Sequence, residues 1–127
     1  MPYYLYNRKL RKFLFLFNHQ SQINNYELLH IESASFFSRD GLIIHGYISF
    51  PLHVERSNLP MVLDVHGVPW SRDFYGFDPE VQLFTNRGYI CFQINYRGST
   101  GYGKEFTNAG DKEWSGTMLN DLVDAVQ

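Results

Sequence analysis

The first part of the chain contains short apolar runs that are separated by polar turns. The runs YYLY and FLFLF flank the polar stretch NRKLRK, which predicts a β-hairpin over residues 3–17. Two further β-rich runs, 34–38 and 42–50, flank Asp40-Gly41. Asp-Gly is a strong hairpin signal because glycine tolerates the positive φ that such a turn requires. The pattern therefore predicts two antiparallel strand pairs.

The second part of the chain has the more continuous apolar runs of a parallel sheet. The segment MVLDV, 61–65, is nearly all apolar, as expected of a strand buried on both faces, and 89–96 repeats this character. Between them, 78–88 predicts a helix with Asp78 as the N-cap and Pro79 at the first helical position. The order strand, helix, strand predicts parallel strands.

The remaining segments complete an α/β pattern. Residues 18–27 are polar and predict a linker or long loop. A glycine-rich loop follows at 97–103, and 104–110 predicts one or two helical turns. Apolar residues recur at helical spacing over 117–127, which predicts a final helix.

Composition and charge exclude several classes of protein. Hydrophobic residues make up 44% and charged residues 19%, which is typical of a globular domain. The net charge of −2 argues against general nucleic-acid binding. No window approaches the ~18 apolar residues of a membrane span, and FLFLF is shorter than the ~7–15 residues of a signal-peptide core. The single cysteine, Cys91, excludes an internal disulfide and favours a reducing compartment, so we expect a cytoplasmic protein.

Two loops follow the carboxyl ends of the predicted parallel strands, where open α/β sheets bind their ligands. They are His-Gly-Val-Pro at 66–69 and Arg-Gly-Ser-Thr-Gly at 97–101. A loop that aims a backbone N–H at a developing oxyanion needs small residues and a fixed turn. Gly67 and Pro69 meet these two needs.

Three motifs in this order resemble the catalytic domain of prolyl oligopeptidase-family serine peptidases, in the acylaminoacyl-peptidase or dipeptidyl-aminopeptidase branch. They are His-Gly-Val-Pro at 66–69, the helix that ends in Arg-Gly-Tyr at 87–89, and Asn-Tyr-Arg-Gly-Ser-Thr-Gly-Tyr-Gly at 95–103. The resemblance is strong over 36–127 and weak over 1–35, which resembles the last blade of a β-propeller. It implies an α/β class and a truncated α/β-hydrolase fold, preceded by a β-hairpin and linker.

The same resemblance implies a Ser-Asp-His triad with the nucleophile in Gly-x-Ser-x-Gly on a strand–helix turn. This motif is absent, since neither Ser99 nor Ser115 has the required spacing. We therefore expect no catalytic residue in this chain, with the triad beyond Gln127. The resemblance implies no cofactor and no metal.

One role of the family carries over to the turn at 66–69. The main-chain N–H groups of Gly67 and Val68 match its oxyanion-hole loop, with Val68 where the family has a second glycine. A β-branched residue at positive φ is an outlier, whereas ordinary β geometry at Val68 would exclude the role. The other predicted site residues brace the site or form the pocket wall: His66, Pro69, Trp70, Arg97 and Gly98.

Several residues have simpler interpretations beside the functional ones. Asp64 and His66 share a strand face, but no third ligand is nearby, so a metal site is not predicted. Asp121 and Asp124 predict a solvated face of the last helix. Trp70 either lines the substrate entrance or packs under its loop.

The sequence leaves several hypotheses for function open. The first is a fragment of a serine peptidase that hydrolyses peptide bonds near the N-terminus of short peptides. The alternatives are a non-catalytic remnant of a broken gene, a docking subunit completed by a separately encoded second half, and, more weakly, an esterase of the same fold. The expected partners are a peptide substrate, a complementary C-terminal half, or a second copy through the edge of strand 61–65; no nucleic acid or membrane is expected.

Overall fold

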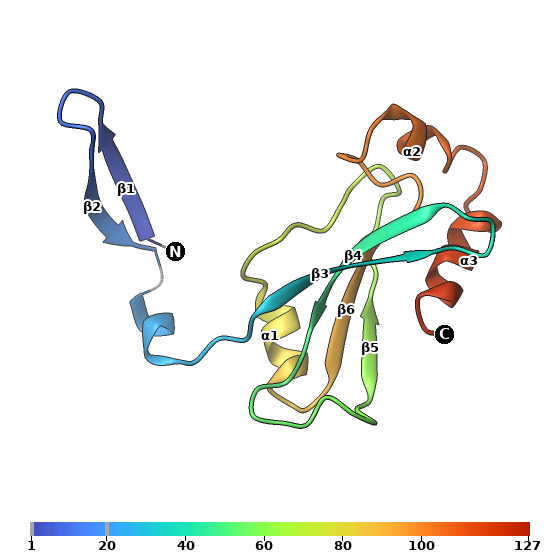
Figure 1. The fold of residues 1–127 in the computed structure, drawn as a ribbon, viewed down its shortest axis with the longest axis horizontal. Coiled ribbons are helices and arrows are strands. Elements are labelled where there is room, and N and C mark those ends of the chain that lie inside the picture. The colour runs from blue at the N-terminus through green and yellow to red at the C-terminus, as the bar shows by residue number, and fades with distance from the viewer. Residues whose placement is uncertain (1, 20) are drawn as a thin grey trace.

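The computed structural model describes residues 2–19 and 21–127, which form two separate β-sheets and several short helices (Figure 1). One sheet is a two-stranded antiparallel hairpin, and the other has four strands in the order β3-β4-β6-β5. The strands are β1 (Pro2–Asn7), β2 (Lys12–Asn18), β3 (Ile31–Phe37), β4 (Ile43–Ser49), β5 (Met61–Asp64) and β6 (Ile90–Asn95). The helices are the 3-10 helix η1 (Ser21–Asn25), α1 (Pro79–Thr85), α2 (Lys104–Asn108) and α3 (Thr117–Asp124).

The predicted strands and α-helices are confirmed, and their limits differ by a few residues. The prediction that strand 61–65 is buried on both faces is wrong, because β5 lies at the edge of the sheet and is only half-buried, with Met61 exposed. β3 begins at Ile31 because it pairs with β4 along its whole length, Ile31 facing Ser49. The predicted linker contains η1, in which the Tyr26 N–H donates to the Ile23 carbonyl over 3.0 Å. This short 3-10 helix satisfies backbone hydrogen-bonding groups of the segment. Its polar composition alone does not predict the helix.

The helix α1 begins where its sequence predicts. The Asp78 side chain accepts hydrogen bonds from the N–H groups of Glu80 and Val81, at 2.8 and 3.2 Å, and Pro79 occupies the first helical position. This cap satisfies donors that the first turn of a helix leaves free.

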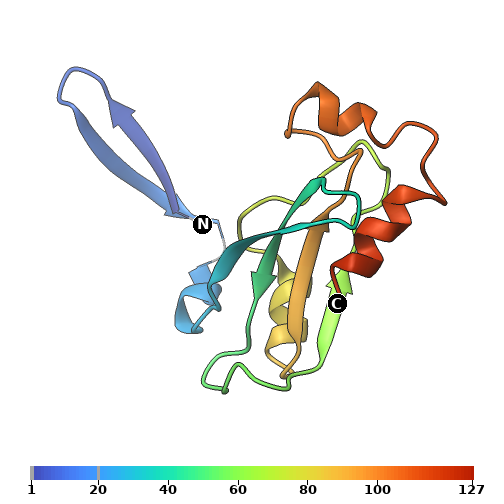
Figure 2. The same ribbon diagram turned by 45° about the vertical axis from the view of Figure 1, so that its right-hand side comes forward.

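The core lies on both faces of the four-stranded sheet (Figure 2). On one face, Val81 of α1 packs with Cys91 and Leu29. On the other, Ile94 packs with Ile44 and Phe106, and α3 adds Leu122. Cys91 and Ile94 are an odd number of positions apart on β6, so they point to opposite faces. The helices α1 and α3 therefore cover opposite faces of the same sheet.

Strand β5 lies at the edge of the sheet and pairs with β6 alone, in parallel. Within the described residues no strand pairs with its other side, as the sequence predicts for strand 61–65. Because parallel strands end at the same side of a sheet, the loops after β5 and β6 lie next to each other. Among the helices that the structure describes, none is both long and apolar enough to cross a membrane.

The β1–β2 hairpin stands away from the four-stranded sheet (Figure 1). Each of its strands is exposed along its length, apart from the half-buried Asn18. Its rings pack on one another across the strands, as in the stacked pair Tyr3 and Phe17 at 4.9 Å. The predicted hairpin is confirmed; its relation to a propeller blade stays a prediction.

Candidate functional site

The turn after β5 contains a valine in the left-handed conformation. Val68 has a φ of +50°, and its carbonyl accepts a hydrogen bond from the Ser71 N–H at 2.9 Å. No described residue accepts a hydrogen bond from the Val68 N–H, and the side chain is 72% exposed. The geometry is therefore the one that glycine adopts easily, and not the ordinary β geometry that would exclude an oxyanion role.

His66 links this turn to the loop after β6. Its ring stacks on the Tyr96 ring, with centroids 4.7 Å apart, and its carbonyl accepts a hydrogen bond from the Tyr96 hydroxyl at 3.0 Å. Nε2 of His66 lies 2.9 Å from the Ser99 hydroxyl, and Nδ1 lies 3.1 Å from the Gly67 carbonyl. His66 thus contacts the side chains of Tyr96 and Ser99 after β6 and the backbone of its own turn, which is a structural role.

Ser99 is not placed as a nucleophile. It is fully buried, and its hydroxyl donates to the Tyr96 carbonyl at 2.6 Å. Since that proton is engaged, His66 donates to Ser99 from Nε2. Sequence reasoning missed Tyr96 and Ser99 as partners of His66, because residues 30 and 33 positions away meet only when the two strands pair.

Arg97 binds two carboxylates from different elements. Its Nε and Nη2 donate to Asp121 at 2.8 Å each, and its Nη1 lies 2.7 Å from Asp40 in the β3–β4 turn. Arg97 and Asp121 are both buried. The hydrogen bonds that Arg97 donates to Asp121 and Asp40 raise its pKa, so Arg97 stays charged.

The prediction that Asp121 and Asp124 form a solvated face is wrong. Asp121 is fully buried against Arg97 and also accepts a hydrogen bond from the Ser38 hydroxyl at 2.8 Å. Asp124 pairs with Arg39 at 2.6 Å, and these hydrogen bonds lower its pKa to about 2. Helical periodicity places both carboxylates on a polar stripe, but it does not reveal that two arginines cover that stripe.

Close backbone contact joins the loops after β5 and β6. The Thr100 N–H donates to the Ser71 carbonyl at 2.9 Å. Gly98 has a φ of +95°, and a Cβ at this position would lie 3.2 Å from Met118 and 3.7 Å from the Pro69 carbonyl. Gly98 therefore allows both a left-handed turn and close packing beside Pro69.

Trp70 lies on the surface of this region. Its side chain is 53% exposed and packs edge-on against Trp114, with ring centroids 6.2 Å apart. Tyr75, by contrast, packs against Tyr47 of β4. Trp70 therefore lies at the surface beside its loop and is not packed beneath it.

Asp73 carries a buried acceptor without a partner. Asn95 holds its backbone, since the Asp73 N–H donates to Oδ1 of Asn95 at 2.7 Å. Its own Oδ2 has no hydrogen-bond partner among the described residues. Burial raises the pKa of the Asp73 carboxyl to about 6, against an opposing effect of His66.

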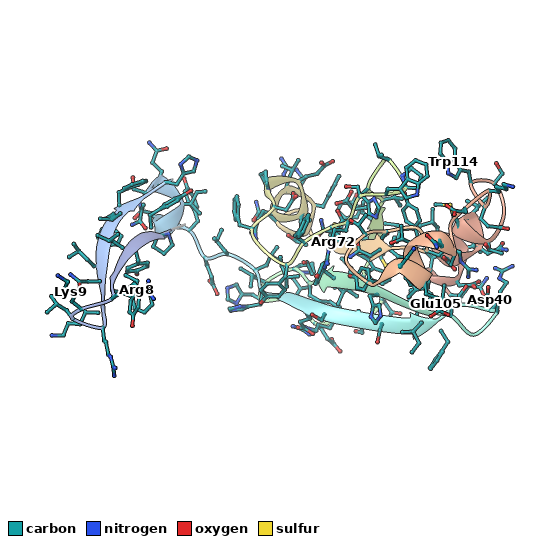
Figure 3. The ribbon with its side chains drawn as sticks, turned by 90° about the horizontal axis from the view of Figure 1, so that it is seen from above. Arg8, Lys9, Asp40, Arg72, Glu105 and Trp114 are labelled. Atoms are coloured by element: carbon teal, nitrogen blue, oxygen red, sulfur yellow. The ribbon has the colours of Figure 1, made fainter. Side chains whose placement is uncertain are left out.

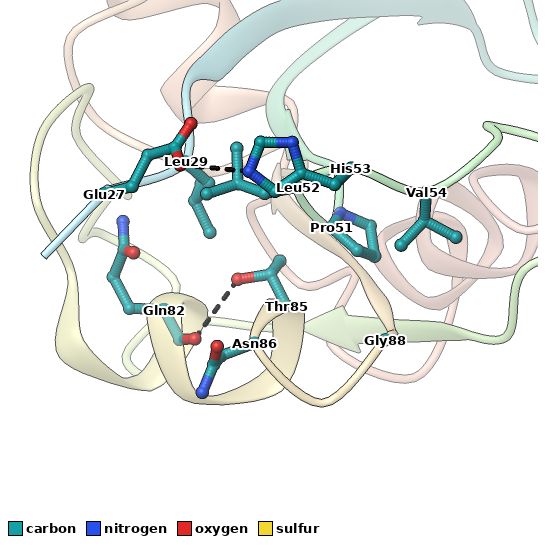
Figure 4. Close-up of a pocket in the computed structure, with 10 residues that line it drawn as sticks. All are labelled: Glu27, Leu29, Pro51, Leu52, His53, Val54, Gln82, Thr85, Asn86 and Gly88. Carbon is teal, nitrogen blue, oxygen red and sulfur yellow. Dashed lines mark hydrogen bonds and ion pairs between the residues drawn. The ribbon is translucent and has the colours of Figure 1, made fainter.

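A cavity of 390 Å³ lies at the opposite end of the sheet (Figure 4). It is lined by residues that follow β4 and residues that precede β6, among them His53 and Gly88. Nε2 of His53 lies 3.0 Å from the Glu27 carboxylate, and both side chains are exposed. Because this cavity is at the amino end of β6, it has no part in the arrangement around Val68.

The chain is similar to peptidases over its whole length. A model of the prolyl oligopeptidase family matches residues 75–127. Dipeptidyl aminopeptidase BIII of Pseudoxanthomonas mexicana is 40% identical over 134 residues, which cover 100% of this chain and 19% of the relative. Dipeptidyl peptidase family member 6 of Caenorhabditis elegans is 36% identical over 149 residues, which cover 99% of this chain and 20% of the relative.

A solved structure shares the fold as well. An acylaminoacyl peptidase in complex with Z-Gly-Gly-Phe-chloromethyl ketone superposes with a TM-score of 0.81 at 25% identity, covering 97% of this chain and 20% of the other. The chain thus spans about a fifth of the length of each of these two relatives.

Proposed function

Because the chain belongs to the prolyl oligopeptidase family of peptidases, we propose that it is part of a serine peptidase that hydrolyses peptide bonds near the N-terminus of short peptides. The observation that carries this proposal is the turn at Val68, whose N–H has no described acceptor at the carboxyl end of β5. The names of the relatives, a dipeptidyl aminopeptidase and a dipeptidyl peptidase, support the substrate class.

In the proposed reaction a serine outside residues 1–127 attacks the peptide carbonyl carbon and passes its proton to the histidine of the triad. The C–N bond then breaks, the amine leaves with that proton, and the acyl-enzyme that remains is hydrolysed by water without a cofactor. The carbonyl oxygen becomes an oxyanion and accepts a hydrogen bond from the Val68 N–H, and the N–H after the nucleophile supplies the second bond. His66 and Arg97 hold the two loops in place, because each binds groups from more than one segment. The acid and the histidine of the triad also lie outside these residues in this proposal.

The proposal includes an arrangement of domains. Residues 31–127 form the first strands and helices of an α/β-hydrolase domain, so the boundary lies before β3 and not at residue 36 as the sequence predicts, and the preceding hairpin and linker come from the last blade of a β-propeller. The single buried thiol of Cys91 supports a reducing compartment such as the cytoplasm.

A second candidate is a docking subunit that a separately encoded half of the domain completes. The unpaired side of β5 favours it, because such an edge accepts an added strand. A non-catalytic remnant would share this edge but would gain no activity from any added half.

Co-expression tests these alternatives. The chain alone should neither release p-nitroaniline from dipeptidyl p-nitroanilides nor react with a fluorophosphonate probe. With a polypeptide that carries the Gly-x-Ser-x-Gly strand and the remaining strands, both signals should appear. Stoichiometric labelling of a serine in this chain would contradict the proposal. A well-folded complex that neither releases p-nitroaniline nor reacts with the probe would favour the remnant.

A backbone substitution in the completed enzyme tests the role of Val68 itself. Replacing Val68 by its α-hydroxy acid removes the N–H and keeps the side chain, so kcat should fall about 10²–10³-fold. Val54, an exposed loop valine at the other end of the sheet, is the matched control and should leave kcat unchanged. Equal kcat values for the two esters would exclude the oxyanion role.

A further inference from the structure

Two buried acceptor atoms border a cavity between β6 and the loop before α1, and neither receives a hydrogen bond from the described residues. They are Oδ2 of Asp73 and Oε1 of Gln93, and both residues line this cavity of 270 Å³. Gln93 is only 4% exposed, and its Nε2 donates to Asp64 at 3.3 Å, which leaves Oε1 as the free atom of the amide. A buried acceptor without a donor costs free energy, so the pair indicates a site for a group that donates hydrogen bonds.

The surroundings of this cavity are negatively charged. Burial raises the pKa of Asp73, and the nearby charges of Asp64 and Asp78 raise it further, whereas His66 lowers it. None of these three aspartates belongs to an ion pair within the part of the chain that the structure describes. A cation bound here would offset both the repulsion between the carboxylates and the cost of burying Asp73.

Arg72 does not supply this cation, although it is next to Asp73 in the chain. Its Nη2 donates to the Tyr47 hydroxyl at 3.1 Å, and its Nε donates to the backbone carbonyl of Asp73 at 3.1 Å. The guanidinium also lies over the rings of Phe74 and Tyr102, 5.0 and 4.8 Å from their centroids. These contacts hold Arg72 on the backbone and the aromatic rings, and no ion pair joins these two described side chains, Arg72 and Asp73.

The walls of the cavity suit a planar cation. Phe74, Tyr75 and Phe77 line it beside the two acceptors, and the first two rings are 69% and 67% exposed, so a ligand can reach it from solvent. A guanidinium stacks on aromatic rings and donates two parallel hydrogen bonds, whereas an ammonium is a compact point charge. The cavity volume also far exceeds the ~30 Å³ that one water molecule occupies.

The cavity adjoins the unpaired edge of the sheet. Asp64, which accepts the hydrogen bond from Gln93, is the last residue of β5. Within the described residues no strand pairs with the other side of β5. Neighbouring strands lie about 4.8 Å apart, so a long side chain on the same face of an added strand can reach the cavity.

We propose that this cavity binds the guanidinium of an arginine in the polypeptide that adds strands to β5. The arginine donates to Oδ2 of Asp73 and to Oε1 of Gln93 and stacks on the aromatic wall. This inference rests on the proposed function for the added strands, and it uses nothing of the catalytic chemistry. A polypeptide without an arginine at this place leaves two buried acceptors unpaired, so the site discriminates between partners.

Calorimetric titration of the full chain with N-acetyl-argininamide tests the site without any partner. We expect saturable binding. N-acetyl-citrullinamide has nearly the same shape without the charge, so it should bind about ten- to a hundredfold more weakly.

Variants of the chain locate the binding. Asp73→Asn, which removes the buried charge, and Gln93→Met, which removes the free acceptor and keeps the length of the side chain, should each weaken binding of N-acetyl-argininamide about tenfold or more. Asp111→Asn, at an exposed aspartate, is the matched control and should bind like the wild type. Far-UV circular dichroism checks that each variant is folded.

Other outcomes would overturn the proposal. Equal binding of the arginine and citrulline amides would show that the cavity does not recognise charge. Tighter binding of N-acetyl-lysinamide would indicate an ammonium site, and tighter binding of calcium chloride would indicate a metal site.

The completed enzyme tests the source of the arginine. Its cavity should already be filled, so N-acetyl-argininamide should no longer bind, and binding that persists would refute the docking role. Fluorophosphonate labelling separates the two proposals. Probe binding by the chain without labelling of the completed enzyme would refute the peptidase function alone, and labelling without probe binding by the chain would refute the arginine site alone.

Discussion

At the scale of single residues, one backbone angle governs the turn after β5. Val68 adopts a φ of +50°, where a β-branched residue is strained by its own Cβ. The turn persists because its neighbours are fixed: His66 by Tyr96 and Ser99, and Ser71 by Thr100. Local strain is thus held in place by contacts between the two strand-end loops.

Val68→Gly should therefore stabilise the chain. Relief of the left-handed strain, about 1–2 kcal/mol, exceeds the added entropy of the unfolded chain, about 0.4–1 kcal/mol. We expect the free energy of unfolding in urea to rise by up to ~1 kcal/mol. Val54→Gly, at an exposed loop valine without positive φ, should lower it by a similar amount. Equal decreases in the free energy of unfolding of the two variants would show that Val68 is not strained.

Asp73 predicts a dependence of stability on pH. Its pKa is about 6 in the folded chain and about 4 when unfolded, so the folded state binds more protons between these values. The free energy of unfolding should fall as pH rises from 4 to 6 and then stay low. Asp73→Asn removes the buried charge and should stabilise the chain at pH 7 by about 1 kcal/mol, since the half-buried carboxylate is partly screened by water.

The matched measurement compares Asp73→Asn with Asp111→Asn, an exposed aspartate, in urea at pH 4 and pH 7. The benefit of Asp73→Asn should be present at pH 7 and nearly absent at pH 4, and Asp111→Asn should have no effect at either. An effect of Asp73→Asn that is the same at both values would show that its charge is not responsible.

At the scale of elements, Arg97 joins three parts of the fold. It contacts Asp40 in the β3–β4 turn and Asp121 in α3, and it lies two positions after the end of β6. The Arg97 N–H also donates to Asp121 at 3.0 Å. The position of α3 against the sheet therefore depends on polar contacts as well as on Leu122 in the core.

Asp121→Ala should destabilise the chain strongly, because it leaves a buried arginine without its main partner. Breaking a buried ion pair costs about 3–5 kcal/mol, and we expect about 3 kcal/mol because Asp40 still contacts Arg97. Asp111→Ala should change the free energy of unfolding by less than about 0.5 kcal/mol. Chemical denaturation of both variants measures these changes. Similarly small changes in the free energy of unfolding would show that Arg97 does not need Asp121.

The unpaired side of β5 should cause the isolated chain to self-associate. A short apolar edge strand without proline or lysine accepts another strand readily. Met61→Lys should reduce the association in size-exclusion chromatography, whereas Ile43→Lys, at an exposed position of a strand paired on both sides, should not. A monomeric wild-type chain with strong amide protection throughout 61–65 would contradict this expectation.

At the scale of the whole molecule, the hairpin and the four-stranded sheet are separate, and they differ in burial. The sheet has a buried core, whereas the hairpin is exposed along both strands. The hairpin exposes nearly all its aromatic residues, with Phe13 at 73%, and carries Arg8 and Lys9 at its tip (Figure 3). A two-stranded hairpin is at best marginally stable in water. Its apolar faces are large enough to require cover from other strands.

Removal of residues 1–19 should leave the four-stranded sheet folded and reduce aggregation. The core clusters draw on residues from Leu29 onward, so the urea midpoint should stay within the error of measurement. Light scattering of the shortened chain should be lower than that of the full chain. A shift of the midpoint by more than about 0.5 M would show that the hairpin stabilises the sheet, because m is about 1–3 kcal/mol/M in urea.

The sequence alone determined the strands, the α-helices and the position of the candidate site, but not the 3-10 helix η1. Local patterns fix these features: apolar runs define β5 and β6, Asp78 and Pro79 begin α1, and Gly41 turns β3 into β4. The place of the strand-end loops follows from the same patterns, because parallel strands end on one side.

Only the tertiary structure decided which side chains meet. It buried Asp121 against Arg97, brought Ser99 to His66, and packed Trp70 on Trp114. Partners in these pairs are 24, 33 and 44 positions apart, so no local period relates them. Burial and charge pairing depend on strand register and on helix position, and both are set by the packing of the whole sheet.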